Sequence, residues 1–236
     1  MSVAAARLAG LELPGEVQLG RVRTTAPRRL SSGVEKLDTL LGGGWPRGRL
    51  SEIAAPRSCG RTALLAASLA AATGRGELVA YIDTAGALDP FSFARSGVDL
   101  ARLLWVRPPT ARDAVRCSEL ILQAGGFAVV VLDWGDAPPQ RLTGSVWPRL
   151  ARAAERANAA LIFAAPVRIA GSFAAVGLSL RRHHPLWTSG LWPLFDGFCS
   201  HASLSHNKLG RPGSETKLEI GEESQTRISC SSRSAG

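Results

Sequence analysis

The apolar residues of this chain fall into short runs that alternate with longer segments of helical periodicity. Each run is short and carries few charges, as in strands that are buried on both faces of a parallel sheet. The expected strands are residues 49–54, 78–83, 103–106 and 127–132, and the expected helices are residues 61–73, 111–124 and 145–157. This alternation predicts βαβ units, and hence an α/β fold with a mostly parallel sheet flanked by helices.

The pattern changes in the last third of the chain. Residues 178–180, 197–204 and 216–220 predict strands without helices between them, and the basic segment Asn207–Gly213 predicts a turn between two of them. Strands that are joined by short turns pair in the antiparallel direction. We therefore expect antiparallel strands at one edge of the sheet, near the C-terminus.

The chain of 236 residues is long enough for one sizeable core. We expect one core domain over residues 30–220. It is preceded by a basic arm with a short helix over residues 1–29 and followed by a Ser-rich, disordered tail over residues 221–236. No run approaches the roughly 18 apolar residues of a membrane span, and the first residues lack the long apolar stretch of a signal peptide. These features predict a cytoplasmic protein with no membrane partner.

The junction between the first expected strand and the first expected helix has the length of a phosphate-binding loop. That motif reads G-x-x-x-x-G-K-[ST]: its backbone amides surround phosphates, its lysine neutralises them and its hydroxyl binds Mg²⁺. Alanine replaces the first glycine here, and Arg61 replaces the lysine, whose compact charge a planar guanidinium does not reproduce. An ordinary strand–turn–helix is the alternative. The candidate nucleotide-binding residues are Ala55, Pro56, Arg57, Ser58, Cys59, Gly60, Arg61 and Thr62.

A further candidate for the nucleotide site is Asp133. It directly follows the most apolar run of the chain, residues 127–132. Ligands of open α/β sheets bind beyond the carboxyl ends of the parallel strands, so an aspartate at this place is suited to support Mg²⁺. The alternative is an aspartate that merely caps the next helix.

The positive charge of the chain is concentrated in one segment. The formal net charge is +9, which favours an acidic or polyanionic partner. Between residues 141 and 182 there are seven arginines and one acid, Glu155. This concentration of charge predicts weak, sequence-independent DNA binding. The alternative is a basic surface that is merely solvated. We expect few exposed aromatic residues near this segment and therefore no base stacking. The candidate DNA-binding residues are Arg149, Arg152, Arg156, Arg168, Arg181 and Arg182.

The cysteines do not predict a disulfide framework or a metal site. Cys59, Cys117, Cys199 and Cys230 lack C-x-x-C spacing, which is typical of reduced thiols in the cytoplasm. Cys199 lies near His201 and His206, but the spacing fits no common zinc site. Alternate positions along a strand explain Cys199 and His201, so we expect no metal ligands here.

Several motifs, in a fixed order, resemble bacterial RecA over about residues 30–220. The matching segments are Leu30–Gly33, Leu37–Asp38, Gly42–Ile53, Tyr81–Pro90, Gly97–Asp99, Val129–Asp133, Leu161–Phe163 and Leu178–Arg182. The resemblance implies a RecA-like P-loop NTPase core. It also implies that Asp133 stands where the family has the aspartate that supports Mg²⁺, and that the basic segment carries the two DNA-facing loops.

The resemblance also identifies chemical groups that this chain lacks. The glutamate that activates water in RecA-type ATPases falls on Ala85, and the polar sensor of the γ-phosphate falls on Ala165 and Pro166. The second DNA-facing loop shrinks to about residues 169–175. Together with Arg61, these changes predict a degenerate ATPase that is not an enzyme. We expect that no cofactor is required, although the loop amides and Thr62 leave room for ATP and Mg²⁺.

Among RecA relatives, the chain is most similar to the ImuA group. These are RecA-like accessory proteins of bacterial error-prone translesion synthesis, and the likeness includes the Asn207–Gly213 turn and the strand after it. It implies a nucleoid-associated adaptor under DNA-damage control, with RecA, a Y-family-type mutasome polymerase and the replication clamp as partners. Two alternatives remain: an active RecA- or RadA-type DNA-dependent ATPase of recombinational repair, and a RecA-like cell-division inhibitor of the SOS response.

Overall fold

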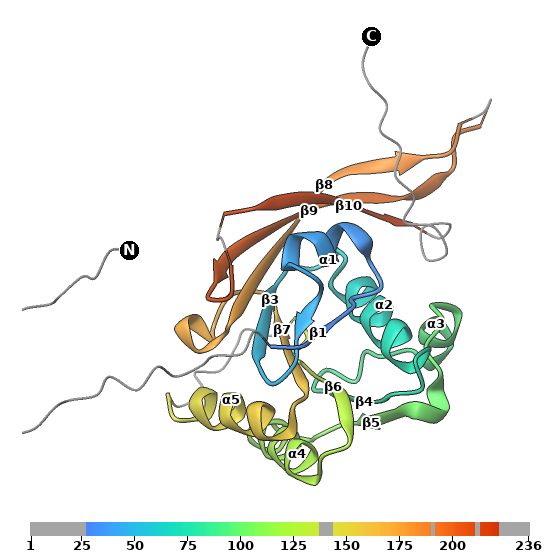
Figure 1. Cartoon of the computed structure of the whole chain (residues 1–236). Coiled ribbons are helices and arrows are strands. Elements are labelled where there is room, and N and C mark those ends of the chain that lie inside the picture. Colours follow the sequence, from blue (N-terminus) through green and yellow to red (C-terminus); the bar gives the residue numbers. More distant parts are fainter. Residues whose placement is uncertain (1–26, 137–143, 190–191, 211–212, 222–236) are drawn as a thin grey trace, which may run out of the picture.

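The computed structural model describes residues 27–136, 144–189, 192–210 and 213–221, and it contains one large sheet with helices on both faces (Figure 1). The basic arm and the Ser-rich tail that the sequence predicts lie almost entirely outside the described residues. The elements in chain order are β1 (Arg29–Leu30), α1 (Glu35–Leu41), β2 (Trp45–Pro46), β3 (Leu50–Ala54), α2 (Arg61–Thr73), β4 (Leu78–Asp83), α3 (Pro90–Arg95), η1 (Leu100–Arg102), β5 (Leu103–Val106), α4 (Ala111–Ala124), β6 (Phe127–Asp133), α5 (Val146–Ala157), β7 (Ala160–Ala165), η2 (Gly171–Phe173), β8 (Val176–Trp187), β9 (Phe195–Asn207) and β10 (Glu215–Gly221).

The sheet confirms the predicted α/β fold with antiparallel strands at its C-terminal edge. Its eight strands run in the order β10-β9-β8-β3-β7-β6-β4-β5. All pairs from β8 to β5 are parallel, whereas β8 with β9 and β9 with β10 are antiparallel. Strand β3 therefore lies inside the sheet, between β7 and β8, and its carboxyl end opens directly into the candidate phosphate loop.

Two hydrophobic cores lie on opposite faces of the sheet. Alternate residues of β6 separate them: Val129 and Val131 pack with α1, α2 and α3, and Val130 and Leu132 pack with α4 and α5. Successive residues of a strand point to opposite faces of the sheet, and helices cover both faces. Both sets of residues are therefore apolar, which explains the continuous apolar runs in the sequence. Figure 1 shows α4 and α5 side by side on one face and α1 and α2 on the other.

Helix α1 is not capped by either of the two serines that precede it. Its N-cap residue is Val34, and no side chain caps the helix. Ser32 instead donates both its backbone N–H (2.7 Å) and its hydroxyl (2.6 Å) to Asp38 Oδ1, and Ser31 donates its hydroxyl to Asp38 Oδ2 at 2.6 Å. The serines thus fix the approach to α1 through a side chain inside the helix.

The C-terminal strands are longer than the sequence predicts. Strands β8 and β9 pair from Val176 with Asn207 to Trp187 with Phe195. From Arg181 onward, nearly every residue of β8 is exposed, so no apolar pattern marks this half of the strand. Figure 1 shows that the far ends of β8 and β9 extend beyond the rest of the sheet. Among the described residues, no helix is long and apolar enough to cross a membrane.

Candidate functional site

The candidate phosphate loop lies between β3 and α2, at the carboxyl edge of the sheet. Ala55 is fully buried and donates its N–H to Ala165 O at 2.9 Å, which fixes the start of the loop on β7. Ser58 and Gly60 adopt positive φ angles of 60° and 88°, so the backbone curls before α2 begins at Arg61. Thr62 is exposed in the first turn of this 13-residue helix. The loop therefore keeps the shape that directs backbone amides and a helix N-terminus toward an anion.

The side chain of Arg61 folds back into this loop. It is only 8% exposed, and its Nη1 donates to Ala55 O at 3.0 Å. Its Nη2 donates to Asp136 Oδ1 at 2.9 Å, and its Nε lies 3.6 Å from Asp133 Oδ1. The guanidinium is thus held by one carbonyl and two carboxylates of the protein itself. A phosphate would have to compete with these partners for its donors.

Asp136 completes a small ionic cluster over the loop. Arg57 Nε donates to Asp136 Oδ2 at 2.9 Å from the exposed side of the loop, while Arg61 bonds the other oxygen. The hydrogen bonds from Arg57 and then Arg61 hold the pKa of Asp136 below its ordinary value. The cluster therefore joins the loop to the chain that follows β6, and its carboxylate stays ionised at neutral pH.

Asp133 is buried and engaged on both of its oxygens. Tyr81 donates its hydroxyl to Oδ2 at 2.5 Å, and Gly135 donates its backbone N–H to Oδ1 at 3.0 Å. Burial, and then the negative charge of Asp133, raise the pKa of Tyr81 far above its ordinary value, so the phenol remains a donor. The structure places Asp133 beside the loop, as the sequence predicts. A metal ion bound there would have to displace the Arg61 guanidinium.

The position of the expected catalytic glutamate is occupied by a methyl group. Ala85 is exposed and packs against Gly135: a Cβ atom built on Gly135 would lie 2.6 Å from the Cβ of Ala85. The γ-phosphate sensor position falls at the end of β7, where Ala165 is fully buried and Pro166 has no N–H to donate. Neither position offers a group that could accept a proton or orient a water molecule.

The last two strands pack directly against the loop. Ser200, on β9, donates its hydroxyl to Cys59 O at 2.6 Å. Ile220, on β10, covers Gly60 so closely that a Cβ atom built on Gly60 would lie 1.9 Å from its Cδ1. No sequence pattern near residue 60 indicates these contacts, because both partners lie far along the chain. The loop is thereby held by both the strand pair and the arginine cluster.

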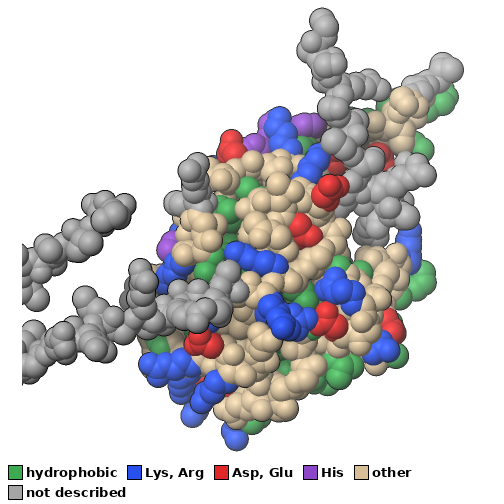
Figure 2. Space-filling view, in the orientation of Figure 1, with side chains coloured by type: hydrophobic (Ala, Val, Ile, Leu, Met, Phe, Trp, Pro, Cys, Tyr) green, Lys and Arg blue, Asp and Glu red, His purple; other side chains and the backbone are tan. Residues whose placement is uncertain are grey.

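The candidate DNA-binding arginines lie on two elements and the segment between β7 and β8. Arg149, Arg152 and Arg156 belong to α5, and Figure 2 shows Lys and Arg side chains gathered over this helix. All three side chains are exposed, and Arg149 Nε also pairs with Glu119 Oε1 on α4 at 2.9 Å. Arg181 and Arg182 are exposed on the far half of β8. Arg141 lies outside the described residues.

Arg168 has a buried partner that the sequence analysis missed. Its Nε lies 3.7 Å from Oε2 of Glu52, a fully buried carboxylate on β3. Oε1 of Glu52 accepts the backbone N–H groups of Ile169 at 2.5 Å and Ala170 at 2.7 Å. Glu52 thus anchors the start of residues 169–175, where the resemblance to RecA places the second DNA-facing loop. A glutamate inside a predicted buried strand was the available signal, since a buried charge needs partners.

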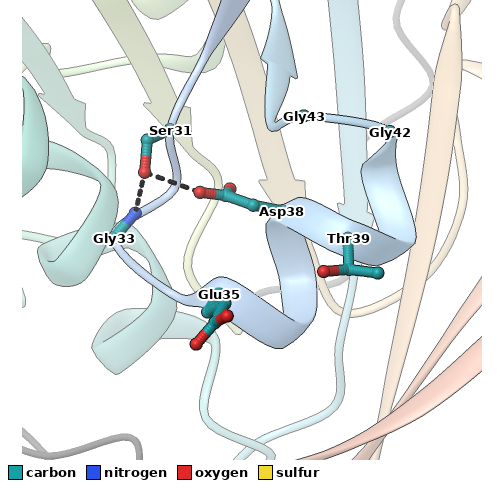
Figure 3. Close-up of a pocket in the computed structure, with 7 residues that line it drawn as sticks. All are labelled: Ser31, Gly33, Glu35, Asp38, Thr39, Gly42 and Gly43. Carbon is teal, nitrogen blue, oxygen red and sulfur yellow. Dashed lines mark hydrogen bonds between the residues drawn. The ribbon is translucent and has the colours of Figure 1, made fainter.

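A shallow hollow beside α1 offers no comparable site. Seven residues line it, and Figure 3 shows Glu35 and Asp38 as its carboxylates. Both oxygens of Asp38 already accept hydrogen bonds from Ser31 and Ser32, which leaves Glu35 as the only carboxylate of the hollow without such partners.

Cys199 and His201 are alternate residues of β9, as the sequence predicts. Among the described residues, no group of three or more His, Cys, Asp or Glu side chains could hold a metal ion.

Comparison with known proteins identifies relatives of this core. The family model of the RecA N-terminal domain matches residues 15–163. Protein RecA of Brevibacillus brevis is 36% identical over 118 residues, which are 50% of this chain and 34% of that protein. Protein RecA of Parasynechococcus marenigrum is 35% identical over 117 residues, which are 50% of this chain and 31% of that protein. The match thus spans about a third of the length of these curated relatives.

The fold is shared with a solved recombinase. The crystal structure of the RadB recombinase superposes with a TM-score of 0.65 and 22% sequence identity, and the match covers 82% of this chain and 96% of that chain. This likeness supports the eight-stranded architecture derived above. Since the family model covers more than half of its residues, this chain belongs to the RecA family, through the RecA N-terminal domain.

Proposed function

We propose that this protein is a RecA-family accessory protein of DNA repair that binds partners and does not hydrolyse ATP. The observation that carries the proposal is the folded-back side chain of Arg61, which donates to Ala55 O and Asp136 Oδ1 and lies 3.6 Å from Asp133 Oδ1. A lysine in this position would present a compact ammonium to the β- and γ-phosphates. Arg61 instead uses its donors to hold the loop and two carboxylates together.

The missing groups strengthen this proposal. General-base catalysis contributes roughly 10²–10⁴ in rate, and the alanine at residue 85 supplies none of it. Placing the nucleophile is a separate contribution, and Pro166 has no side-chain or backbone donor for it. Two losses of this size, together with the altered lysine, would leave no useful turnover. Binding of ATP and Mg²⁺ without hydrolysis is compatible with the exposed Thr62 and the loop amides.

The finer proposal is an adaptor role in damage-induced, error-prone translesion synthesis, like that of the ImuA group. Relatives named RecA support a role in DNA repair, and the resemblance to ImuA supports RecA, a Y-family-type mutasome polymerase and the replication clamp as partners. Weak DNA binding would use the exposed arginines of α5 and β8. A RecA-like core without catalytic groups still offers the surface that such partners recognise.

Phosphate release from ATP by the purified full chain, with and without single-stranded DNA, tests the loss of hydrolysis. We expect no DNA-stimulated release from the wild type and none from Arg61→Lys, because a restored lysine still lacks a base. DNA-stimulated release that disappears in Thr62→Ala, an exposed position that leaves the core intact, would refute the proposal. That result would instead favour an active RecA-type ATPase.

A chromosomal deletion tests the adaptor role separately. We expect the deletion to lower damage-induced mutation frequency, and a chain with Ala85→Glu to restore it to the wild-type level, because the function does not depend on residue 85. An unchanged mutation frequency together with altered cell length after damage would contradict the adaptor role and favour a cell-division inhibitor.

A further inference from the structure

Strand β10 forms one edge of the large sheet, and its outer side has no partner strand among the described residues. It pairs with β9 without interruption, from Glu215 opposite Ser203 to Gly221 opposite Gly197. Within the described part of the chain, the backbone hydrogen bonds of residues 215–221 go only to β9. An edge of this kind is a template on which one more strand can pair.

The edge has only one of the usual protections against such pairing. Proteins protect edge strands by making them short, by bulges or prolines, or by charged side chains. β10 is seven residues long, compared with four for β5 at the opposite edge, and contains no proline. Helix α1 packs on one face of β10, over Leu218 (Figure 1), but it does not pair with the backbone of the strand. The remaining protection is the charge of Glu215, Lys217 and Glu219.

The exposed aromatic end of the β8–β9 hairpin does not belong to this edge. β10 ends opposite Gly197, whereas Trp187 pairs with Phe195 further along the hairpin. Trp187, Trp192 and Phe195 are 58%, 84% and 61% exposed. The expectation of few exposed aromatic residues near the basic segment was therefore wrong, because β8 and β9 continue past the core. The pairing edge is confined to residues 215–221 and does not include these rings.

The charges of β10 complement those of a second, antiparallel copy of the same strand. Glu215, Lys217 and Glu219 are alternate residues and share one face of the sheet. When two copies pair over the whole strand, Leu218 lies opposite Leu218, and Lys217 of each copy lies opposite Glu219 of the other. Lys217 is exposed and Glu219 is half-buried, and neither has an ion-pair partner within the described part of its own chain.

The other registers are less favourable. A shift by two residues toward Glu215 places Lys217 opposite Lys217 and Glu215 opposite Glu219, and like charges that face each other across strands are destabilising. A shift by two residues the other way places Glu219 opposite Glu219. A larger shift toward Glu215 brings opposite charges together again, but it pairs residues 215–217 alone. The charges thus favour the register that uses the full strand.

We propose that two copies of this chain pair antiparallel through β10, with Leu218 of each copy opposite Leu218 of the other. The pairing joins the two sheets into one and, being two-fold, closes with two copies. Since Leu218 is only 3% exposed in the single chain, the contact consists mainly of backbone hydrogen bonds and two ion pairs. This inference goes beyond the proposed function, because the contact needs neither ATP nor DNA.

Sedimentation velocity of the full chain, without nucleotide or DNA, tests the pairing. We expect the wild type to convert from monomer to dimer as its concentration rises through the roughly micromolar range. Lys217→Glu and Glu219→Lys should each weaken dimerisation roughly 4- to 800-fold, because each change turns two attractive pairs into two repulsive ones.

A mixture of these two variants gives the sharpest test of the register. The new glutamate of one variant faces the new lysine of the other, and the unchanged Glu219 of the first faces the unchanged Lys217 of the second. The mixture should therefore dimerise with about the wild-type affinity, which also shows that both variants are folded. The control is Arg116→Glu, an exposed position on α4 with the same change of charge as Lys217→Glu, which should leave dimerisation unchanged.

Each outcome decides the proposal. Wild-type dimers, weaker dimers in both single variants and rescue in the mixture support it. A wild type that stays monomeric through this range, or dimers that neither variant weakens, overturn it. Weakening without rescue also overturns it, because residue 217 then does not lie opposite residue 219. The proposed function is independent of these results, since phosphate release and mutation frequency are measured separately.

Discussion

Gly60 provides a quantitative test of how the last strand packs against the phosphate loop. In Gly60→Ala, the new Cβ would lie 1.9 Å from Ile220 Cδ1, at a φ of 88°. The left-handed backbone costs about 1–2 kcal/mol for a residue with a Cβ atom, and displacing the isoleucine adds about 1–3 kcal/mol. We therefore expect the free energy of unfolding to fall by about 2–5 kcal/mol.

Two further variants divide this loss into its parts. Gly42 has a φ of 72° and nothing within 4 Å of a built Cβ, so Gly42→Ala should cost only the backbone contribution. Ile220→Val removes Cδ1, after which the nearest atoms to the new methyl group lie at 3.4 Å and 3.8 Å. In the Ile220→Val background, Gly60→Ala should therefore cost about as much as Gly42→Ala, about 1–2 kcal/mol.

Urea denaturation of the four variants and the wild type measures these differences from the transition midpoints and slopes. The double variant should lose about 1–3 kcal/mol less stability than the sum of the losses in Gly60→Ala and Ile220→Val. If Gly60→Ala costs no more than Gly42→Ala in the wild-type background, β10 does not seat on the loop in solution and the reasoning fails.

Three other predictions concern the buried carboxylate, the ionic cluster and the basic helix. Glu52→Ala leaves the N–H groups of Ile169 and Ala170 without acceptors, so the free energy of unfolding should fall by about 2–5 kcal/mol. Glu52→Gln keeps an acceptor oxygen and should lose clearly less stability. Equal losses of the two variants in urea denaturation would contradict this prediction. The pKa of Asp136 is lowered in the folded state, so this carboxylate stabilises the fold at pH values above its unfolded pKa, and the stabilisation is lost as the pH falls through the folded pKa. In Arg57→Ala, the folded pKa of Asp136 should rise toward its ordinary value, as measured by an NMR titration of the carboxyl group. An unchanged pKa would refute the ionic cluster. Changing Arg149, Arg152 and Arg156 together to Ala should weaken duplex DNA binding and reduce the magnitude of the slope of log affinity against log salt concentration by about two to three. The control Lys36→Ala, on α1, should change neither the affinity nor the slope. An unchanged slope in the triple variant would place the DNA elsewhere.

The sequence predicts elements well where the apolar pattern is local. Helix α2 and strands β4 and β5 have the predicted bounds, because buried Ala and Leu positions or a continuous apolar run define each of them. The far halves of β8 and β9 leave no such trace, since their residues pair across the hairpin while their side chains remain in water. Strand length there is set by backbone pairing, which a burial pattern does not record.

The candidate site divides in the same way. The motif positions in the sequence predict three features of the site: the loop itself, Asp133 beside it and the alanine at residue 85. The conformation of Arg61 does not, because it depends on Asp136, which lies 75 residues further along the chain. The contact of Ser200 with Cys59 spans 141 residues and carries no local signal. Such contacts are fixed by the order of strands in the sheet, and that order is a property of the whole chain.

The central place of β3 has a consequence for how the protein is made. This strand leaves the ribosome more than 100 residues before its neighbours in the sheet: Leu50 pairs with Leu161, and Ser51 pairs with Val176. Until then both edges of β3 expose unpaired backbone groups, which pair readily with other chains. The phosphate loop waits longer still, because Ser200 and Ile220 are among the last residues of the core to be synthesised. Nascent chains that stall before β8 should therefore be prone to aggregation, and the phosphate loop reaches its final packing only after β10 has joined the sheet.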